Sequence, residues 1–191
     1  MTSSTTETAA RGLILTPGAG GGRDNRTLVA VERQVAPLPC LRLDFPYQIA
    51  GRRAPDRAPI AIAHLVEQAD HFAADHGIPA GRLVLGGRSY GGRMCSMAVA
   101  EGLPAAGLVL LSYPLHPPGS PDKLRVDHFP AIRVPVLFVS GERDPFGSPA
   151  EFAEHVSSIP GPVTQVWLPG GHDPRAESRV GVVVAHWLAA L

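Results

Sequence analysis

Short apolar runs alternate along the chain with longer segments of helical periodicity. Most of the short runs are apolar without alternation, which indicates strands buried on both faces, as in a parallel sheet. The predicted strands are Leu13–Thr16, Cys40–Phe45, Arg82–Gly86, Ala106–Ser112, Val136–Ser140 and Thr164–Leu168. We therefore predict an α/β fold with about six mostly parallel strands and helices on both faces of the sheet.

The segment after Pro59 has the clearest helical pattern. Its apolar positions recur at i, i+3, i+4 and i+7 and form one face of a helix that ends near His76–Gly77. These positions are Ile62, Leu65, Val66, Ala69, Phe72 and Ala73. Further helices are expected over Asn25–Gln34, Gly91–Glu101, Pro149–Ser157 and Arg179–Ala190. Strand and helix alternate, so ligands are expected in the loops beyond the carboxyl ends of the strands.

Length and composition fit one domain. Of the 191 residues, 45% are hydrophobic, which is enough to bury a full core over residues 12–191. The opening MTSSTTETAAR lacks the basic and apolar parts of a secretory signal, so we expect residues 1–11 to form a flexible tail. No apolar run approaches the roughly 20 residues that span a bilayer. We expect a cytoplasmic protein with no membrane partner.

Charge and cysteine usage narrow the choice of partners. The 17 basic and 17 acidic residues cancel and form no block of like charge, so no footprint for nucleic acid is visible. A small, weakly charged molecule is the expected partner, and the oligomeric state stays open. Cys40 and Cys95 have no metal-ligand spacing, which is typical of thiols in a reducing compartment. We expect no metal and no organic cofactor.

One serine lies between glycines directly after a predicted strand. Gly87-Arg88-Ser89-Tyr90-Gly91 matches the pattern G-x-S-x-G, and the strand before it and the helix after it are the context of a nucleophile elbow. In such an elbow the serine adopts a strained backbone conformation, and the glycines let neighbouring backbone approach closely. The alternative is a glycine-rich turn with an incidental serine. The strand-turn-helix context favours Ser89 as a nucleophile.

A serine nucleophile needs a base and a group that orients the base. Asp144 follows the fifth predicted strand and His172 follows the sixth, which gives the order Ser, Asp, His. His172 lies between glycines and a proline. Five other histidines fall on helical patterns and two in loops, and all seven are less well placed. Asp173 is a rival acid, but a residue adjacent to the histidine usually cannot reach round to its ring, so we assign the orienting role to Asp144.

Acyl transfer also needs two donors for the oxyanion. We expect them to be the backbone N–H groups of Tyr90, after the nucleophile, and of Ala19, in the glycine-rich loop Leu15–Asn25. That loop also suggests a dinucleotide site. However, the third glycine of G-x-G-x-x-G would fall at Arg23, and no acidic residue at a strand end convincingly binds a ribose, so the nucleotide interpretation is weak.

Several further residues are candidates for the substrate pocket. Tyr47, His116 and Phe146 could line a shallow pocket whose wall is stiffened by prolines between residues 114 and 121. Arg88 flanks the nucleophile and could bind an acidic substrate group, as could three arginines after the second strand, Arg52, Arg53 and Arg57. The alternative, which we favour, is that these arginines form salt bridges that fix the loops, with Asp44, Asp56 or Glu142 as partners.

Four blocks of the sequence together resemble a known family. They are FPYQIAGRRAPDRAP (45–59), GGRSYGGRM (86–94), YPLHPPGSPDKLR (113–125) and SGERDPFG (140–147). With the triad order and the first loop, they are similar to the α/β-hydrolase fold and, within it, to the dienelactone-hydrolase-like branch that includes testis-expressed protein 30 and subunit 3 of the regulatory NSL complex. The resemblance implies a compact fold without the first two strands of larger members, in which Tyr113–Pro130 replaces a lid domain.

The sequence departs from that branch at three positions. Pro17 stands where similar proteins often carry histidine, which implies a differently tuned oxyanion hole. Tyr90 replaces the usual methionine and changes the side chain but not the backbone donor. Dienelactone hydrolases use a cysteine nucleophile, whereas here that position is Ser89, and Cys95 lies farther along as a buried thiol. Some members of the branch are scaffold subunits, so the resemblance argues for fold more strongly than for turnover.

These observations predict a serine hydrolase that cleaves a small ester or related acyl substrate through an acyl-enzyme on Ser89. Two alternatives stay open. One is a noncatalytic interaction module with a vestigial triad, although a scaffold has no reason to keep strained glycines around Ser89. The other is a thioesterase or carrier-protein hydrolase that uses the same triad.

Overall fold

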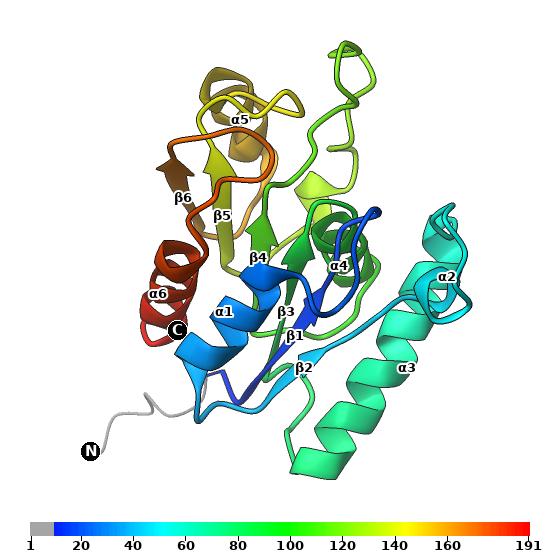
Figure 1. Cartoon of the computed structure of the whole chain (residues 1–191). Coiled ribbons are helices and arrows are strands. Elements are labelled where there is room, and N and C mark those ends of the chain that lie inside the picture. The colour runs from blue at the N-terminus through cyan, green and yellow to red at the C-terminus, as the bar shows by residue number, and fades with distance from the viewer. Residues whose placement is uncertain (1–9) are drawn as a thin grey trace.

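The computed structural model describes residues 10–191 and contains one parallel sheet (Figure 1). Its strands lie in the order β2-β1-β3-β4-β5-β6, and every neighbouring pair is parallel. The strands are β1 (Gly12–Thr16), β2 (Cys40–Arg42), β3 (Leu83–Arg88), β4 (Gly107–Leu111), β5 (Val136–Gly141) and β6 (Val163–Leu168). All six predicted strands are therefore present, and the predicted α/β class is confirmed.

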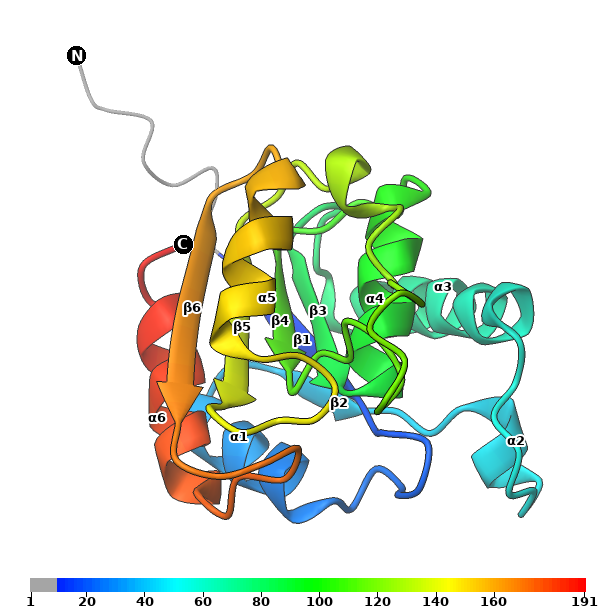
Figure 2. The ribbon, with the colours of Figure 1, turned by 90° about the horizontal axis from the view of Figure 1, so that it is seen from above.

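Helices cover both faces of the sheet (Figure 2). They are α1 (Arg26–Val35), α2 (Pro46–Ile49), α3 (Ala58–His76), α4 (Tyr90–Ala100), α5 (Pro149–His155) and α6 (Glu177–Leu188), with short 3-10 helices at Phe129–Ala131 and Val156–Ser158. Helices α1 and α6 pack on one face, over Leu13, Leu15 and Val84, whereas α3, α4 and α5 pack on the other, over Ile14 and Leu85. Alternate residues of each central strand thus enter opposite halves of the core.

Burial along the strands follows their place in the sheet. Every residue of β1, β4 and β5 is buried, which confirms that uninterrupted apolar runs mark strands covered on both faces. The edge strands β2 and β6 are mostly half-buried. The second strand was predicted to reach Phe45 but ends at Arg42, because Pro46 begins the short helix α2, which the sequence pattern did not reveal.

The connection from β4 to β5 contains no large inserted domain. Between Leu111 and Val136 its regular structure is the 3-10 helix Phe129–Ala131, so this connection holds no lid domain. The segment is anchored by Tyr113, which is fully buried and donates a hydrogen bond through its hydroxyl to the carbonyl of Arg125 at 2.7 Å. Within residues 10–191 no helix is both long and apolar enough to cross a membrane.

Candidate active site

Ser89 lies at the turn between β3 and α4 and has an unusual backbone. Its φ is +50° and its ψ is −113°, a conformation that side-chain-bearing residues rarely adopt, as predicted for a nucleophile elbow. The flanking glycines explain how the turn can form. A Cβ on Gly87 would lie 2.5 Å from the carbonyl oxygen of Thr16, and one on Gly91 would lie 2.6 Å from that of Pro17. The glycines are therefore needed because β1 and its loop pass directly against the elbow.

The structure brings Ser89, His172 and Asp144 together from three loops at the carboxyl edge of the sheet. The Nε2 of His172 lies 2.9 Å from the Oγ of Ser89, and its Nδ1 lies 2.8 Å from Oδ2 and 3.0 Å from Oδ1 of Asp144. A carboxylate can only accept, so Nδ1 carries the proton and Nε2 keeps a lone pair directed at the serine hydroxyl. Asp144 is nearly fully buried, and its Oδ1 also accepts from the backbone N–H of Phe146 at 2.9 Å.

Asp173, the rival acid, faces a different partner. Its carboxylate lies 3.3 Å from the guanidinium of Arg88, which also donates to the backbone carbonyl of His172 at 3.1 Å. Arg88 is therefore engaged with the His172 loop and holds the backbone on which the imidazole is mounted. Salt bridging, the favoured interpretation of Arg88, agrees with this geometry, but the carboxylate partner is one that the sequence reasoning had not assigned.

The glycine-rich loop after β1 lies against the turn that carries Ser89. A Cβ on Gly18 would be 3.6 Å from the Cβ of Ser89. The carbonyl of Gly18 accepts from the backbone N–H of Gly21 at 3.2 Å and from the side chain of Gln48 at 3.4 Å. In a trans peptide the N–H points opposite to the carbonyl, so the N–H of Ala19 is directed away from Gly21 and Gln48. The carbonyl of Ala19 accepts from the hydroxyl of Tyr47 at 3.1 Å.

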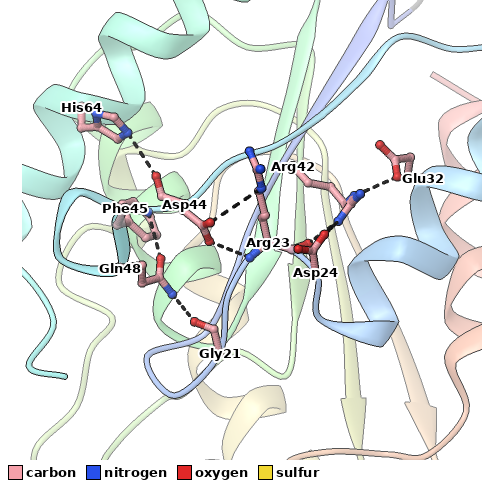
Figure 3. A network of polar contacts seen from close by, with 9 residues as sticks. All are labelled: Gly21, Arg23, Asp24, Glu32, Arg42, Asp44, Phe45, Gln48 and His64. Atoms are coloured by element: carbon pink, nitrogen blue, oxygen red, sulfur yellow. Dashed lines mark hydrogen bonds and ion pairs between the residues drawn. The ribbon is translucent and has the colours of Figure 1, made fainter. Parts of the chain in front are cut away.

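A polar network fixes the far end of this loop (Figure 3). Arg23 donates its backbone N–H to Asp44 at 2.6 Å, and Gln48 donates to the carbonyl of Gly21. Arg42 contacts both Asp24, at 2.6 Å, and Glu32, at 2.8 Å. These bonds connect the glycine-rich loop to β2, through Arg42, and to α2, through Gln48.

Aromatic side chains pack together next to the glycine-rich loop. The ring of Tyr90 packs edge-on against Phe45 and Tyr47, with centroids 5.2 and 6.1 Å apart. Its hydroxyl donates to the backbone carbonyl of Asp56 at 2.7 Å, and burial raises the pKa of Tyr90 above its ordinary value. The carboxylate of Asp56 accepts from the backbone N–H of Tyr47 at 2.8 Å and pairs with Arg52 at 2.6 Å. Tyr90 and Tyr47 are thus held as neutral, fixed side chains.

The remaining pocket candidates have different surroundings. Tyr47 lines a hollow of about 550 Å³ together with the first loop, Gln48 and Arg52. Phe146 stacks on the imidazole of His172, with centroids 4.0 Å apart, and so covers one face of the histidine that contacts the serine. His116 is buried and contacts the carbonyl of Pro117 at 2.8 Å and Glu151 at 3.0 Å. Both ring nitrogens of His116 are therefore occupied by protein acceptors, which leaves neither free to bind a ligand.

The other charged residues and the cysteine considered from the sequence are paired or buried. Arg52 pairs with Asp56, one of the expected partners, while Asp44 pairs with Arg23. Cys95 is fully buried, and burial raises the pKa of its thiol to about 12, so it is an inert core residue. Within residues 10–191 no group of three or more His, Cys, Asp or Glu side chains is arranged to hold a metal ion.

Comparison with known proteins agrees with this architecture. Residues 9–190 match the family described as Alpha/beta hydrolase domain. The chain belongs to this family. Similar solved structures include Est1E from Butyrivibrio proteoclasticus with bound ferulic acid, with 15% identity, a TM-score of 0.74, and coverage of 98% of this chain and 91% of that one.

Two further solved structures represent other hydrolases. A carboxylesterase from Mesorhizobium loti is 20% identical, with a TM-score of 0.67 and coverage of 95% of this chain and 90% of that one. The RedJ thioesterase of the prodiginine pathway in Streptomyces coelicolor is 16% identical, with a TM-score of 0.68 and coverage of 96% and 87%. At these identities the likeness concerns the fold. The family match supports a hydrolase.

Proposed function

We propose that the protein is a serine hydrolase that cleaves a small ester or related acyl substrate. The observation that carries the proposal is the continuous contact from Asp144 through His172 to Ser89, with the serine in a strained turn. The strained backbone of Ser89 supports the proposal, because strain of this kind is concentrated at functional sites. A buried, desolvated acid behind the histidine also suits a triad that must stabilise an imidazolium.

In this proposal His172 takes the proton of Ser89 through Nε2 as the Oγ attacks the acyl carbon. The alkoxide or thiolate leaving group then receives that proton from the imidazolium and departs, leaving an ester on Ser89. Water attacks this acyl-enzyme with His172 again as the base, and Ser89 is regenerated. Asp144 holds the proton on Nδ1 throughout and stabilises the imidazolium. No metal or organic cofactor takes part.

Two backbone N–H groups would stabilise the tetrahedral oxyanion. Tyr90 is the first residue of α4, so its N–H has no partner inside the helix. The N–H of Ala19 belongs to the peptide whose carbonyl is turned toward Gly21 and Gln48, and Gly18 lies beside Ser89. This arrangement supports Tyr90 and Ala19 as the donors. Removing one such donor costs about 10²–10³-fold in turnover in related chemistry.

The finer affiliation is also part of the proposal. We assign the chain to the dienelactone-hydrolase-like branch on the strength of the four sequence blocks, with Ser89 replacing its cysteine nucleophile. A thioester is a second candidate substrate, because the RedJ thioesterase shares the fold. A noncatalytic scaffold is less consistent with the geometry, since it has no use for a half-buried, strained serine paired with a histidine.

Hydrolysis of 4-nitrophenyl acetate and of acetyl-pantetheine tests the proposal. We expect turnover of at least one substrate by the wild type and a loss of at least about 10³-fold in Ser89→Ala. Ser157→Ala is a matched control, because Ser157 is exposed and its hydroxyl donates to the carbonyl of Glu154, its near neighbour in sequence, at 3.2 Å. Equal rates for wild type and Ser89→Ala would overturn the assignment.

A further inference from the structure

The glycine-rich loop after β1 has little steric support at the point where it carries the expected oxyanion donor. Ala19, Gly20 and Gly21 are exposed, and a Cβ on Gly20 or Gly21 would meet no atom within 4 Å. Glycine has more backbone freedom than any other residue, so packing does not fix the direction of the peptide groups here. Hydrogen bonds must therefore set the direction of the N–H of Ala19.

Two side chains of α2 supply hydrogen bonds to this loop. Gln48 donates from Nε2 to the carbonyl of Gly21, as Figure 3 shows, and to that of Gly18 at 3.4 Å. An NH₂ group has two donors, so it can serve both carbonyls. The hydroxyl of Tyr47, the residue before Gln48, donates to the carbonyl of Ala19 at 3.1 Å. Adjacent residues of one short helix thus hold three carbonyls of the loop.

Gln48 is itself held at the other end of its amide group. Its Oε1 accepts from the backbone N–H of Phe45 at 2.9 Å, which forms the capping box of α2. Phe45 is fully buried, and the backbone N–H of Tyr47 donates to the buried carboxylate of Asp56 at 2.8 Å, so the start of α2 is fixed. Because the amide oxygen faces a fixed donor, the NH₂ group is directed at the loop.

The bond from Gln48 to Gly18 acts on the peptide that contains the expected oxyanion donor. The carbonyl of Gly18 and the N–H of Ala19 belong to one planar trans peptide and point in opposite directions. Gly18 is buried beside the nucleophile, and a Cβ there would lie 3.6 Å from the Cβ of Ser89. Holding the carbonyl of Gly18 toward α2 therefore directs the N–H of Ala19 away from α2.

We propose that Gln48 is a positioning residue for the oxyanion hole. It holds the Gly18–Ala19 peptide in the orientation that stabilises the transition state, and Tyr47 supports the next peptide through the carbonyl of Ala19. This inference rests on the proposed function, because the donor matters only if Ser89 forms a tetrahedral intermediate. A preorganised donor needs no reorientation when the oxyanion forms, so a loosened loop lowers kcat and leaves KM unchanged.

Two substitutions separate the donor of Gln48 from its acceptor and from charge. Gln48→Glu keeps the oxygen that caps α2 and loses the donor, whereas Gln48→Met is neutral and of similar length but lacks both groups. With 4-nitrophenyl acetate we expect each variant to lower kcat at least about tenfold, with KM within about threefold of the wild type. Gln34→Glu is the matched control, because Gln34 is exposed on α1 and should keep the wild-type kcat.

Inhibition by a trifluoromethyl ketone gives a readout that belongs to the oxyanion. The Oγ of Ser89 adds to the carbonyl carbon, His172 takes the serine proton, and the former carbonyl oxygen becomes the oxyanion of a hemiketal. The inhibition constant should rise in Gln48→Met by about the same factor as kcat/KM falls. A kcat of Gln48→Met within about threefold of the wild type, a loss that appears in KM alone, or an unchanged inhibition constant would overturn the proposal.

Three further measurements separate this result from misfolding and from the hydrolase assignment. Thermal melting reports whether each variant is folded, and Tyr47→Phe, which removes only a hydroxyl, should also lower kcat with KM unchanged. By NMR, the amide order parameter of Ala19 should fall in Gln48→Met from about 0.85 toward about 0.6, whether or not the chain is catalytic. Equal nitrophenol release by wild type and Ser89→Ala would refute the hydrolase function, whereas an active enzyme with an unchanged kcat and order parameter in Gln48→Met would refute the positioning role alone.

Discussion

Replacing Asp144 with asparagine should abolish most activity by reversing the tautomer of His172. The backbone N–H of Phe146 lies 2.9 Å from Oδ1 and needs an acceptor, so the asparagine should keep its carbonyl oxygen there. Its NH₂ group then takes the place of Oδ2, which lies 2.8 Å from Nδ1 of His172. Facing a donor, Nδ1 becomes the acceptor, and Nε2 carries the proton instead. The lone pair that would accept the proton of Ser89 is lost.

The size of the effect follows from this loss of the base. A triad with the wrong histidine tautomer loses about 10⁴-fold in kcat, equivalent to about 5.5 kcal/mol of transition-state stabilisation. We expect Asp144→Asn to lose between about 10³-fold and 10⁴-fold in the hydrolysis of 4-nitrophenyl acetate, with its thermal midpoint close to that of the wild type because the two side chains have nearly equal volume.

Asp173→Asn provides the matched control. Asp173 is adjacent to His172 in sequence, but its carboxylate lies 3.3 Å from Arg88 and is largely exposed, so its loss should reduce activity by less than about tenfold. If Asp144→Asn kept activity within about tenfold of the wild type, or if Asp173→Asn lost as much, the assignment of the acid would be wrong.

The other predictions concern stability. Gly91→Ala places a Cβ 2.6 Å from the carbonyl oxygen of Pro17 and should lower the free energy of unfolding by several kcal/mol, whereas Gly20→Ala meets no atom within 4 Å and should change it by less than about 1 kcal/mol in urea titrations. A small effect of Gly91→Ala would refute the close packing at the elbow. Because burial lowers the pKa of His128 to about 4 from 6.5, the unfolded chain binds a proton first as pH falls, and stability is lost from pH 6.5 down to pH 4. Between about pH 7.5 and about pH 5, His128→Gln should reduce that loss by about 2 kcal/mol, and an unchanged pH dependence would contradict the burial of a neutral histidine.

The sequence predicted the strands well because their burial is simple. Central strands such as β4 are buried on both faces, so their composition alone identifies them. The bounds of β2 were harder, since an edge strand is only half-buried and its run continues into the proline that begins α2. Helix α2 has only four residues, which is too short for a periodic pattern.

The candidate triad could be named from sequence because the topology constrains it. Residues directly after parallel strands meet at one edge, so Ser89, Asp144 and His172 were predicted to lie close together, and their contacts agree. The arginines were less predictable. Arg88 and Arg93 are both close to Ser89 in sequence, but only the three-dimensional arrangement shows that Arg88 pairs with Asp173 while Nε of Arg93 is buried without a hydrogen-bond partner among the described residues. Long side chains pair with residues that are distant in sequence, so the spacing of residues along the chain does not predict those pairs.

The most direct test of the proposed hydrolase site is intact-mass analysis after treatment with a fluorophosphonate, with the adduct mapped by peptide sequencing. Such a probe reacts with a serine whose base and oxyanion donors are assembled. We predict one adduct, on Ser89, in the wild type and none in His172→Ala. A folded wild-type protein that remains unlabelled, or an adduct that persists in His172→Ala, would contradict the proposed function.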